Sequence, residues 1–360
     1  MVTPTRPAAR TGRGAVSNPD GRFEATRSEA VDDGWGSLDE ELPPLETLVR
    51  PDPARSIISR NNSPDLSFDQ SINPYRGCEH GCIYCYARPS HGYLNLSPGL
   101  DFETRLFFKQ DAARLLEQEL AAANYRCSPI TIGANTDPYQ PIEREYRVTR
   151  SIIEVLARYR HPFSIITKSS LIERDVDLLA PLARERLVLA LVSVTTLSGE
   201  LKRTLEPRTA SPAARLRAIR TLTQAGVPVG VMVAPVIPVL TDSEMEKILE
   251  AAAQAGATSA GYVVLRLPYE VKDLFREWLQ EHEPLKAQHV MNRMQAMRGG
   301  KDYDSAWGVR QRGTGEYAQL LNMRFQAACR RYGLRTGERF IHNTTLFERP
   351  IIGPEQLTLI

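Results

Sequence analysis

Short apolar runs alternate with amphipathic helical segments through the middle of this chain of 360 residues. The runs are rich in β-branched residues and apolar along their whole length, which is typical of strands in a parallel sheet buried on both faces. Five of them lie at residues 129–133, 163–167, 187–192, 229–233 and 261–265. With one more strand expected just before Cys78, they predict about six β/α units.

Helix signals between the runs agree with this alternation. Ser211 and Pro212 provide an N-cap and a proline at the first helical position, and Gly226 can end that helix. Thr241 and Glu244 have the spacing of a capping box ahead of the next helix. We therefore expect an α/β fold, namely a partial parallel β/α barrel of about six strands.

The two ends of the chain differ from this middle part. Residues 1–54 are rich in Pro, Gly, Ser and charge and lack hydrophobic periodicity, so we expect a disordered N-terminal arm. Residues 55–285 would form the barrel. Residues 286–360 would form a mainly helical C-terminal extension, with helices expected at 285–297 and 316–331.

The net charge of +2 conceals a gradient along the chain. Residues 1–54 hold six Arg against ten Asp and Glu, about −4, whereas residues 286–360 hold twelve Lys and Arg against six Asp and Glu, about +6. A basic C-terminal part is compatible with nucleic acid as a partner, and a solvated basic face explains so small an excess equally well. No apolar run could span a bilayer and no signal sequence is visible, so we expect a cytoplasmic protein.

Three of the five cysteines fall in one short stretch, with the spacing Cys78-x3-Cys82-x2-Cys85. The other two, Cys127 and Cys329, are isolated, so the cysteines do not form the even, regularly spaced set of a disulfide framework. Three clustered thiols instead indicate a metal site that lacks one protein ligand.

Two kinds of metal site could use these thiols. A structural zinc site needs four ligands, so His80, His91 or a distant cysteine would have to complete it. An iron–sulfur cluster bound by three thiolates keeps one iron open for a substrate or cofactor. Zinc motifs usually bring two separated pairs of ligands, and the sequence offers no second pair, which favours the cluster.

Polar residues gather where the predicted strands end. In β/α barrels the functional site lies at the carboxyl ends of the strands. Each of these residues could instead serve an ordinary turn, reach solvent or satisfy local backbone groups. Their joint placement favours a site, because it recurs at successive strand ends. After the cysteine loop, the ends in chain order carry Asn135, Thr136 and Asp137; Lys168; Ser193 and Thr195; the proline-rich residues 234–238; and Arg266.

The cysteine motif, with aromatic Tyr84 before its last thiol and on the first loop of a predicted barrel, resembles the signature of the radical S-adenosylmethionine superfamily. Within it, the chain resembles the spore photoproduct lyase-like branch, whose proteins are often called DNA repair photolyases. That resemblance rests on Tyr75-Arg76-Gly77-Cys78, Tyr84-Cys85-Tyr86-Ala87, Asn135-Thr136-Asp137-Pro138-Tyr139 and Thr167-Lys168-Ser169.

The resemblance implies a 4Fe-4S cluster bound by Cys78, Cys82 and Cys85, with S-adenosylmethionine on the open iron. One electron, from a donor of flavodoxin or ferredoxin type, would cleave S-adenosylmethionine and yield a 5′-deoxyadenosyl radical that abstracts hydrogen from a substrate. Residues 135–137 would meet the methionine ammonium, Lys168 and Ser193 the carboxylate or ribose, and residues 233–237 the adenine. The implied cofactor contacts are Tyr84, Asn135, Thr136, Asp137, Lys168, Ser193, Thr195 and Val236.

One departure from the branch concerns the substrate reaction. Spore photoproduct lyase uses a further cysteine as hydrogen-atom donor, whereas the second strand end here has Asn135 and no cysteine. We therefore expect a lyase-like radical enzyme with an unidentified substrate, nucleic acid being one candidate. The alternatives are a zinc-stabilised nucleic-acid-binding module and a protein that uses a cluster for electron transfer or sensing.

Arg310 and Arg312, flanked by Trp307 and Tyr317, form a basic and aromatic group in the C-terminal part. Such a combination suits nucleic-acid contact. A packed loop is the competing interpretation, and the sequence leaves both open.

Overall fold

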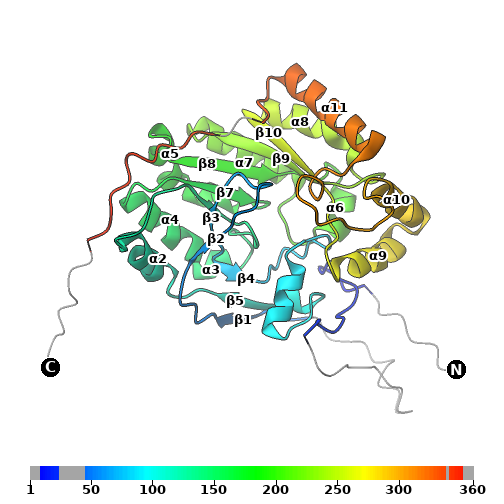
Figure 1. The fold of residues 1–360 in the computed structure, drawn as a ribbon, viewed down its shortest axis with the longest axis horizontal. Helices are drawn as coiled ribbons and strands as arrows, with labels where there is room; N and C mark the ends of the chain where they lie inside the picture. Colours follow the sequence, from blue (N-terminus) through cyan, green and yellow to red (C-terminus); the bar gives the residue numbers. More distant parts are fainter. Residues whose placement is uncertain (1–8, 24–44, 338–339, 352–360) are drawn as a thin grey trace, which may run out of the picture.

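The computed structural model describes residues 9–23, 45–337 and 340–351. Within them, the main sheet has the strand order β10-β9-β8-β7-β6-β3-β2 (Figure 1). Neighbours from β3 to β10 pair in parallel, and the short edge strand β2 (Ile58–Arg60) pairs antiparallel with β3. The parallel strands are β3 (Gln70–Ile72), β6 (Ile130–Ile132), β7 (Phe163–Thr167), β8 (Val188–Ser193), β9 (Val229–Val236) and β10 (Ser259–Val264).

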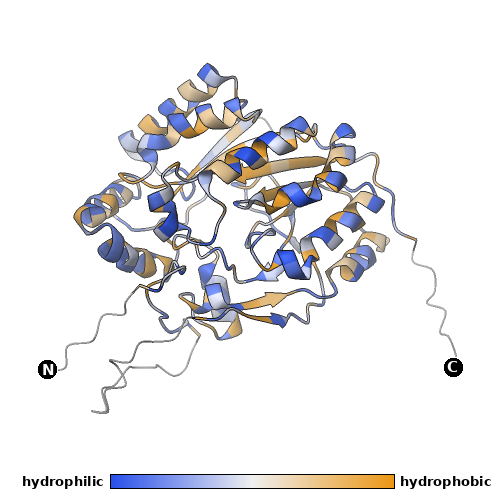
Figure 2. Cartoon of the chain, turned by 180° about the vertical axis from the view of Figure 1, so that it is seen from behind, coloured by the Kyte–Doolittle hydropathy of each residue, from blue (hydrophilic) through white to orange (hydrophobic). Residues whose placement is uncertain are grey.

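The six parallel strands confirm the predicted partial barrel. Ile72, Ile132 and Ile165 stand side by side across three strands and are fully buried. Figure 2 shows strands that are hydrophobic along their length beneath helices with hydrophilic outer surfaces. Every residue of β3 and β6 is buried, so both faces of the sheet are covered at these two strands.

Five helices connect consecutive strands and lie outside the sheet (Figure 1). The hydroxyl of Ser211 accepts a hydrogen bond from the amide of Ala214 (3.2 Å), which confirms the predicted N-cap. The predicted capping box is wrong, because the side chain of Thr241 caps nothing and the short turn η3 (Asp242–Glu244) precedes the helix. These helices are α2 (Ala112–Ala121), α4 (Val148–Arg158), α5 (Val176–Arg184), α7 (Pro212–Gln224) and α8 (Met245–Gln254).

A second, three-stranded sheet flanks the cysteine loop. Its order is β1-β5-β4, with β1 (Leu48–Pro51) parallel and β4 (Tyr75–Arg76) antiparallel to β5 (Arg105–Phe108). The short helices η1 (Arg88–Leu94) and α1 (Asp101–Thr104) connect the cysteine loop to β5. The strand β1 lies in the part of the chain for which the sequence predicts disorder.

Residues 9–23, which we call the N-terminal segment, also differ from the predicted disordered arm. The amides of Gly14 and Ala15 donate to the carboxylate of Glu103 (both 2.9 Å), and Ala15 is buried. Because the segment is held through its backbone groups, it needs no hydrophobic periodicity, and its sequence does not predict that it packs against the rest of the protein. Residues 1–8 and 24–44 of the predicted arm lie outside the described residues.

The C-terminal part contains α9 (Val271–His282), α10 (Pro284–Ala296) and α11 (Gly315–Tyr332). The last two match the predicted helices to within one residue. The helix α11 packs against α8, where Arg324 forms an ion pair with Glu246 (2.7 Å). None of the helices within the described ranges has the length and apolar character needed to cross a membrane.

Candidate cofactor site at the carboxyl ends of the strands

The three clustered cysteines lie on one loop between β4 and η1. None forms a disulfide; Cys78 and Cys82 are buried and Cys85 is half-buried. The loop turns at Gly77 and Gly81, whose φ angles of 73° and 68° favour glycine. A Cβ atom on Gly77 would also lie 2.7 Å from the side chain of Leu106, so the turn requires glycine for its packing as well.

Three fully buried glutamates hold this loop in place. Each accepts a hydrogen bond from a side chain within or beside the loop and forms an ion pair with an arginine. Buried charges require such pairing, because an unpaired carboxylate in the interior is strongly disfavoured. The contacts are Tyr75 to Glu143, Tyr84 to Glu206 and Arg88 to Glu103, and the paired arginines are Arg174, Arg215 and Arg88.

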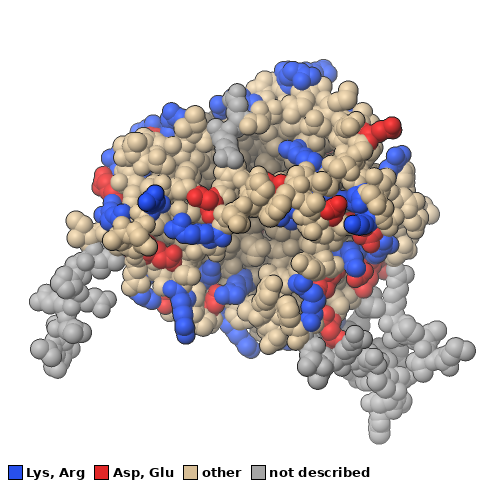
Figure 3. All heavy atoms as spheres, in the orientation of Figure 1, with Lys and Arg blue, Asp and Glu red and all other residues tan. Residues whose placement is uncertain are grey.

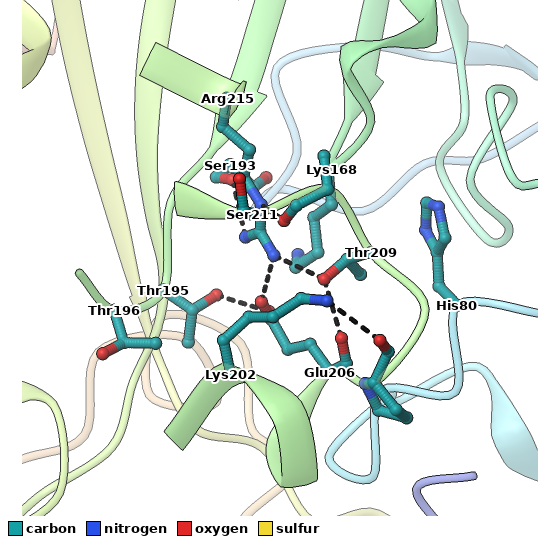
Figure 4. A network of polar contacts seen from close by, with 12 residues as sticks. His80, Lys168, Ser193, Thr195, Thr196, Lys202, Glu206, Thr209, Ser211 and Arg215 are labelled. Carbon is teal, nitrogen blue, oxygen red and sulfur yellow. Dashed lines mark hydrogen bonds and ion pairs between the residues drawn. The ribbon is translucent and has the colours of Figure 1, made fainter. Parts of the chain in front are cut away.

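Glu206 connects the cysteine loop with the end of β8, and Figure 4 shows its contacts with Thr195 and Arg215. Its carboxylate accepts from the hydroxyls of Tyr84 and Thr195, the second at 2.7 Å, and pairs with Arg215. Arg215 in turn donates to the carbonyl of Ser193 (3.1 Å). Burial alone would raise the pKa of Glu206, but the charges of Arg215 and Lys168 and the hydrogen bonds lower it to about 2. Glu206 is therefore a permanent buried anion beside the loop.

Asp137 does not fit the predicted role of binding the methionine ammonium. Its carboxylate accepts from the hydroxyl of Thr167 (2.7 Å), the amide of Lys168 (2.7 Å) and the amide of Tyr139 (2.9 Å). It also lies 3.3 Å from Nδ1 of His80, within the cysteine loop. These partners fill the four acceptor positions of a carboxylate. Asp137 therefore joins three segments of the site, a role that its position after a strand could not reveal.

Asn135 and Thr136 occupy the same strand end but differ in availability. Asn73 Oδ1 accepts from both of their backbone amides, at 2.7 and 3.3 Å. The hydroxyl of Thr136 is buried and donates to the carbonyl of Tyr75 (3.2 Å). The half-buried side chain of Asn135 makes no hydrogen bond to another described residue. Of the three residues predicted for the ammonium, Asn135 alone keeps its side chain available.

Among the other predicted cofactor contacts, some side chains are buried or already hydrogen-bonded and others are available. Thr195 and Val236 are fully buried, and the hydroxyl of Thr195 is used by Glu206 and by the carbonyl of Ala234 (3.0 Å). Neither residue therefore exposes a surface that could make the predicted direct contact with the cofactor. Lys168 is half-buried, forms no ion pair within the described ranges, and its amine lies 5.8 Å from the ring centre of Tyr84. Lys168 remains a candidate for binding the carboxylate, and Ser193 lies at the neighbouring strand end.

The cysteine loop fits an iron–sulfur cluster better than a zinc ion. Across the described part of the chain, no three His, Cys, Asp or Glu side chains converge on one point as a single metal ion requires. Of the two candidate histidines, His80 uses Nδ1 towards Asp137 and His91 uses Nε2 towards the carbonyl of Arg105 (2.9 Å), so each keeps one ring nitrogen without a partner among these contacts. A cubane cluster bonds each thiolate through a different iron, so thiols spread along one loop suit it.

Charges of both signs lie around the thiols, since burial and the charge of Asp137 raise the pKa of Cys78. Burial and the charge of Glu206 raise the pKa of Cys82 to about 12, and the charge of Lys168 opposes this effect. At Cys85 burial again raises the pKa, whereas the charges of Arg88 and Lys168 lower it. Cations at this distance stabilise thiolates once a metal replaces their protons.

The basic and aromatic group of the C-terminal part is only partly packed, because Trp307 and Arg312 are exposed. Arg310 forms an ion pair with Asp65 (2.5 Å), and the guanidinium of Arg312 lies 3.8 Å from the ring centre of Tyr262. The hydroxyl of Tyr317 donates to Asp242 (2.5 Å). Within this group, the ring of Trp307 remains 55% exposed.

Sequence reasoning missed the three buried glutamates. Each lies in a polar stretch that reads as a solvent-exposed surface, and ion pairs between distant segments have no local sequence signal. Glu206 is followed by a proline, which indicates that a helix ends at that point, but nothing in the sequence indicates that Glu206 is buried. Tertiary structure alone shows that these residues anchor the cysteine loop.

Comparison with known proteins identifies the family. The chain is 40% identical over 225 residues to an uncharacterized protein of Mycobacterium tuberculosis, which covers 62% of this chain and 66% of that protein. It is 30% identical over 173 residues to an uncharacterized protein of Methanocaldococcus jannaschii, covering 48% and 62%. The chain thus spans slightly less than two thirds of the length of these relatives.

The fold is similar to that of spore photoproduct lyase. A structure of that enzyme with bound AdoMet and dinucleoside spore photoproduct has a TM-score of 0.53, with 14% identity over 79% of this chain and 80% of that chain. The family model of the radical SAM superfamily matches residues 72–252, which is just over half of the chain and includes the cysteine loop. Members of this superfamily use a 4Fe-4S cluster and S-adenosylmethionine. The chain therefore belongs to the radical SAM superfamily.

Proposed function

We propose that Cys78, Cys82 and Cys85 hold a 4Fe-4S cluster whose open iron takes S-adenosylmethionine, and that the resulting radical abstracts hydrogen from a nucleic-acid substrate. The observation that carries the first part is the loop itself. Its three free thiols are fixed by buried glutamates from separate parts of the chain. When bound and reduced, the cluster supplies the electron that cleaves S-adenosylmethionine into methionine and a 5′-deoxyadenosyl radical.

The available polar side chains suit the two ends of the methionine group. Lys168 offers an ammonium for the carboxylate, since it forms no ion pair with a described residue, although its charge acts on Glu206. The free amide of Asn135 suits the amino group, whereas Ser193, at the neighbouring strand end, is only 3% exposed. Tyr84 and Thr195 act indirectly, because Glu206 holds their hydroxyls. Asp137 positions His80 and the backbone of Lys168.

Two observations support nucleic acid as the substrate class. The protein shares its fold with spore photoproduct lyase, whose structure holds a dinucleoside. Tyr86 directly follows Cys85, and 45% of its surface is exposed, which offers a ring for stacking with a base. The overall charge adds little, because Lys and Arg are interspersed with Asp and Glu on the face that Figure 3 shows.

The proposed reaction differs from that of a lyase with a cysteine donor. Cys127 precedes β6 and so lies at the opposite end of that strand from the site. Cys329 is buried in α11, outside the barrel. We therefore assign hydrogen abstraction to this site without a cysteine that returns hydrogen to the substrate. A one-electron donor of flavodoxin or ferredoxin type would reduce the cluster.

Anaerobic reconstitution with iron and sulfide tests the proposal. After reduction in the presence of S-adenosylmethionine, the protein should release 5′-deoxyadenosine. Adding perdeuterated single-stranded DNA should place deuterium in that product, as mass spectrometry would show. The control is the Cys78→Ala, Cys82→Ala, Cys85→Ala triple variant. Release no greater than that of the triple variant would refute the cofactor assignment, and release without deuterium would refute the DNA substrate.

A further inference from the structure

Arg266 lies at the mouth of the barrel, directly after β10. The amide of its neighbour Leu265 donates to the carbonyl of Val236 (3.0 Å), which places Arg266 beside the end of β9. Its guanidinium lies 4.9 Å from the ring centre of Tyr86. Because Tyr86 follows the cluster ligand Cys85, Arg266 stands next to the place where the radical would form.

Arg266 lacks an acidic partner within the described part of the chain. Its one hydrogen bond there is long, from Nη2 to the hydroxyl of Tyr303 (3.4 Å). Its Nε atom is buried and has no hydrogen-bond partner. Nearby arginines are neutralised, since Arg276 pairs with Asp302 (2.8 Å) and Arg310 with Asp65 (2.5 Å). The charge of Arg266 is therefore uncompensated.

A second arginine adds to this positive charge. Arg298 is 1% exposed and donates to the carbonyls of Leu265 and Val309 (both 2.9 Å), with its Nε unpartnered. It forms no ion pair with a described residue. Burial lowers the pKa of Arg298, whereas Tyr303 and the charge of Asp304 raise it and the charge of Arg266 lowers it. The end of β10 thus holds two arginines and no carboxylate bound to either.

A bound anion would compensate the positive charge of these two arginines. Partly buried guanidinium groups without a counter-charge are unfavourable, and a planar guanidinium can bind two oxygens of a phosphate at once. Tyr86 supplies an aromatic face at the same place, and its hydroxyl is fixed by donation to the carbonyl of Ala134. A phosphate joined to a planar base would satisfy both groups.

We propose that Arg266 binds a phosphate group of the substrate, with the adjacent base on the ring of Tyr86. This inference rests on the proposed nucleic-acid substrate and names the residues that would select it. The site is separate from that of the S-adenosylmethionine carboxylate, because Lys168 follows β7, three strands away from β10 in the sheet.

The test measures binding of a short fluorescein-labelled oligothymidylate to the reconstituted protein with S-adenosylmethionine, by fluorescence anisotropy. Arg266→Ala should raise Kd about tenfold, as expected when one charge-assisted contact is lost. The slope of log affinity against log salt should fall by about 0.7. The Kd of Arg266→Lys should lie between the values for the wild type and Arg266→Ala, because lysine keeps the charge and loses the planar guanidinium. Arg217→Ala, at an exposed position on α7, should match the wild type.

A neutral methylphosphonate version of the same oligomer separates phosphate binding from a general loss of structure. Wild type and Arg266→Ala should bind it equally, because no charged phosphate remains for Arg266 to contact. The inference is overturned if the wild type does not bind the charged oligomer, if Arg266→Ala binds it as tightly as the wild type, or if the loss is equally large for the neutral oligomer. A fall in S-adenosylmethionine affinity in Arg266→Ala would assign Arg266 to the cofactor instead.

This result is distinguishable from a failure of the proposed function. Release of 5′-deoxyadenosine without oligonucleotide reports on the cluster and S-adenosylmethionine alone. Binding of the oligomer reports on Arg266 whether or not that release occurs.

Discussion

At the residue scale, the site depends on buried carboxylates that do not touch the reacting groups. Glu206 shows this most clearly, because one side chain joins Tyr84 of the cysteine loop, Thr195 after β8 and the cation of Arg215. The sequence predicted the residues that follow strands but assigned Asp137 to the cofactor, although its oxygens are already used by Thr167 and by two backbone amides. The position of a residue after a strand predicts that its side chain lies near the site. It does not predict whether the polar atoms of that side chain are available to bind a cofactor.

We predict that Glu206→Gln lowers the free energy of unfolding of the cluster-free protein by about 3–5 kcal/mol, because it leaves the buried charge of Arg215 unpaired. Tyr84→Phe removes one hydrogen bond from a carboxylate and should cost about 1.5–3 kcal/mol. Urea unfolding followed by circular dichroism measures both. Glu154→Gln is the matched control, since its exposed ion pair with Arg150 should change stability by less than about 0.5 kcal/mol. Equal midpoints for Glu206→Gln and Glu154→Gln would contradict this account.

The lowered pKa of Glu206 predicts a pH dependence of stability. The folded value of about 2 lies below the ordinary value of 4.5, so the carboxylate stabilises the fold above pH 4.5. That contribution, about 3 kcal/mol, should be lost as the pH falls from 4.5 towards 2. Unfolding experiments across this range should give a steeper decline for the wild type than for Glu206→Gln. Parallel curves would show that Glu206 titrates alike in both states.

At the scale of elements, the strands and most helices were predictable and the N-terminal segment was not. Apolar runs such as 163–167 coincide with β7 because burial on both faces fixes their composition. The N-terminal segment is held by backbone amides at Glu103 and by an ion pair between Arg22 and Glu270 (2.6 Å). Such contacts produce no periodic pattern in the sequence. Through them the N-terminal segment connects Glu103, beside the cysteine loop, to Glu270, which precedes α9.

The N-terminal segment should protect the cluster loop. A Cβ atom on Gly14 would lie 1.7 Å from the carbonyl oxygen of Gly81, between Cys78 and Cys82, so Gly14→Val must displace the segment from the loop. We predict a folded variant whose cluster bleaches several times faster in air than that of the wild type, followed by visible absorbance. Gly199→Ala, where an added Cβ meets nothing within 4 Å, is the control. Equal bleaching rates in the three proteins would show that the segment shields nothing.

At the scale of the whole molecule, the cysteine loop is held by contacts that do not involve metal. Its glutamate anchors come from α1, from α3 (Glu143–Tyr146) and from the turn after α6 (Gly199–Leu205). The extensive hydrophobic core runs through the barrel and the helices around it. Contacts within the protein therefore contribute to holding the loop, unlike in small zinc domains that fold only with their metal.

This arrangement predicts that the protein stays folded without its cluster. The Cys78→Ala, Cys82→Ala, Cys85→Ala variant should keep the helix content of the wild type and unfold in one cooperative transition, as far-ultraviolet circular dichroism would show. Its stability should equal that of the cluster-free wild type to within about 1–2 kcal/mol, because three thiols on a largely preformed loop contribute little packing. A variant with lost helix content or a broad transition would mean that the cluster organises the loop, and the three buried glutamates would then be insufficient to define the site.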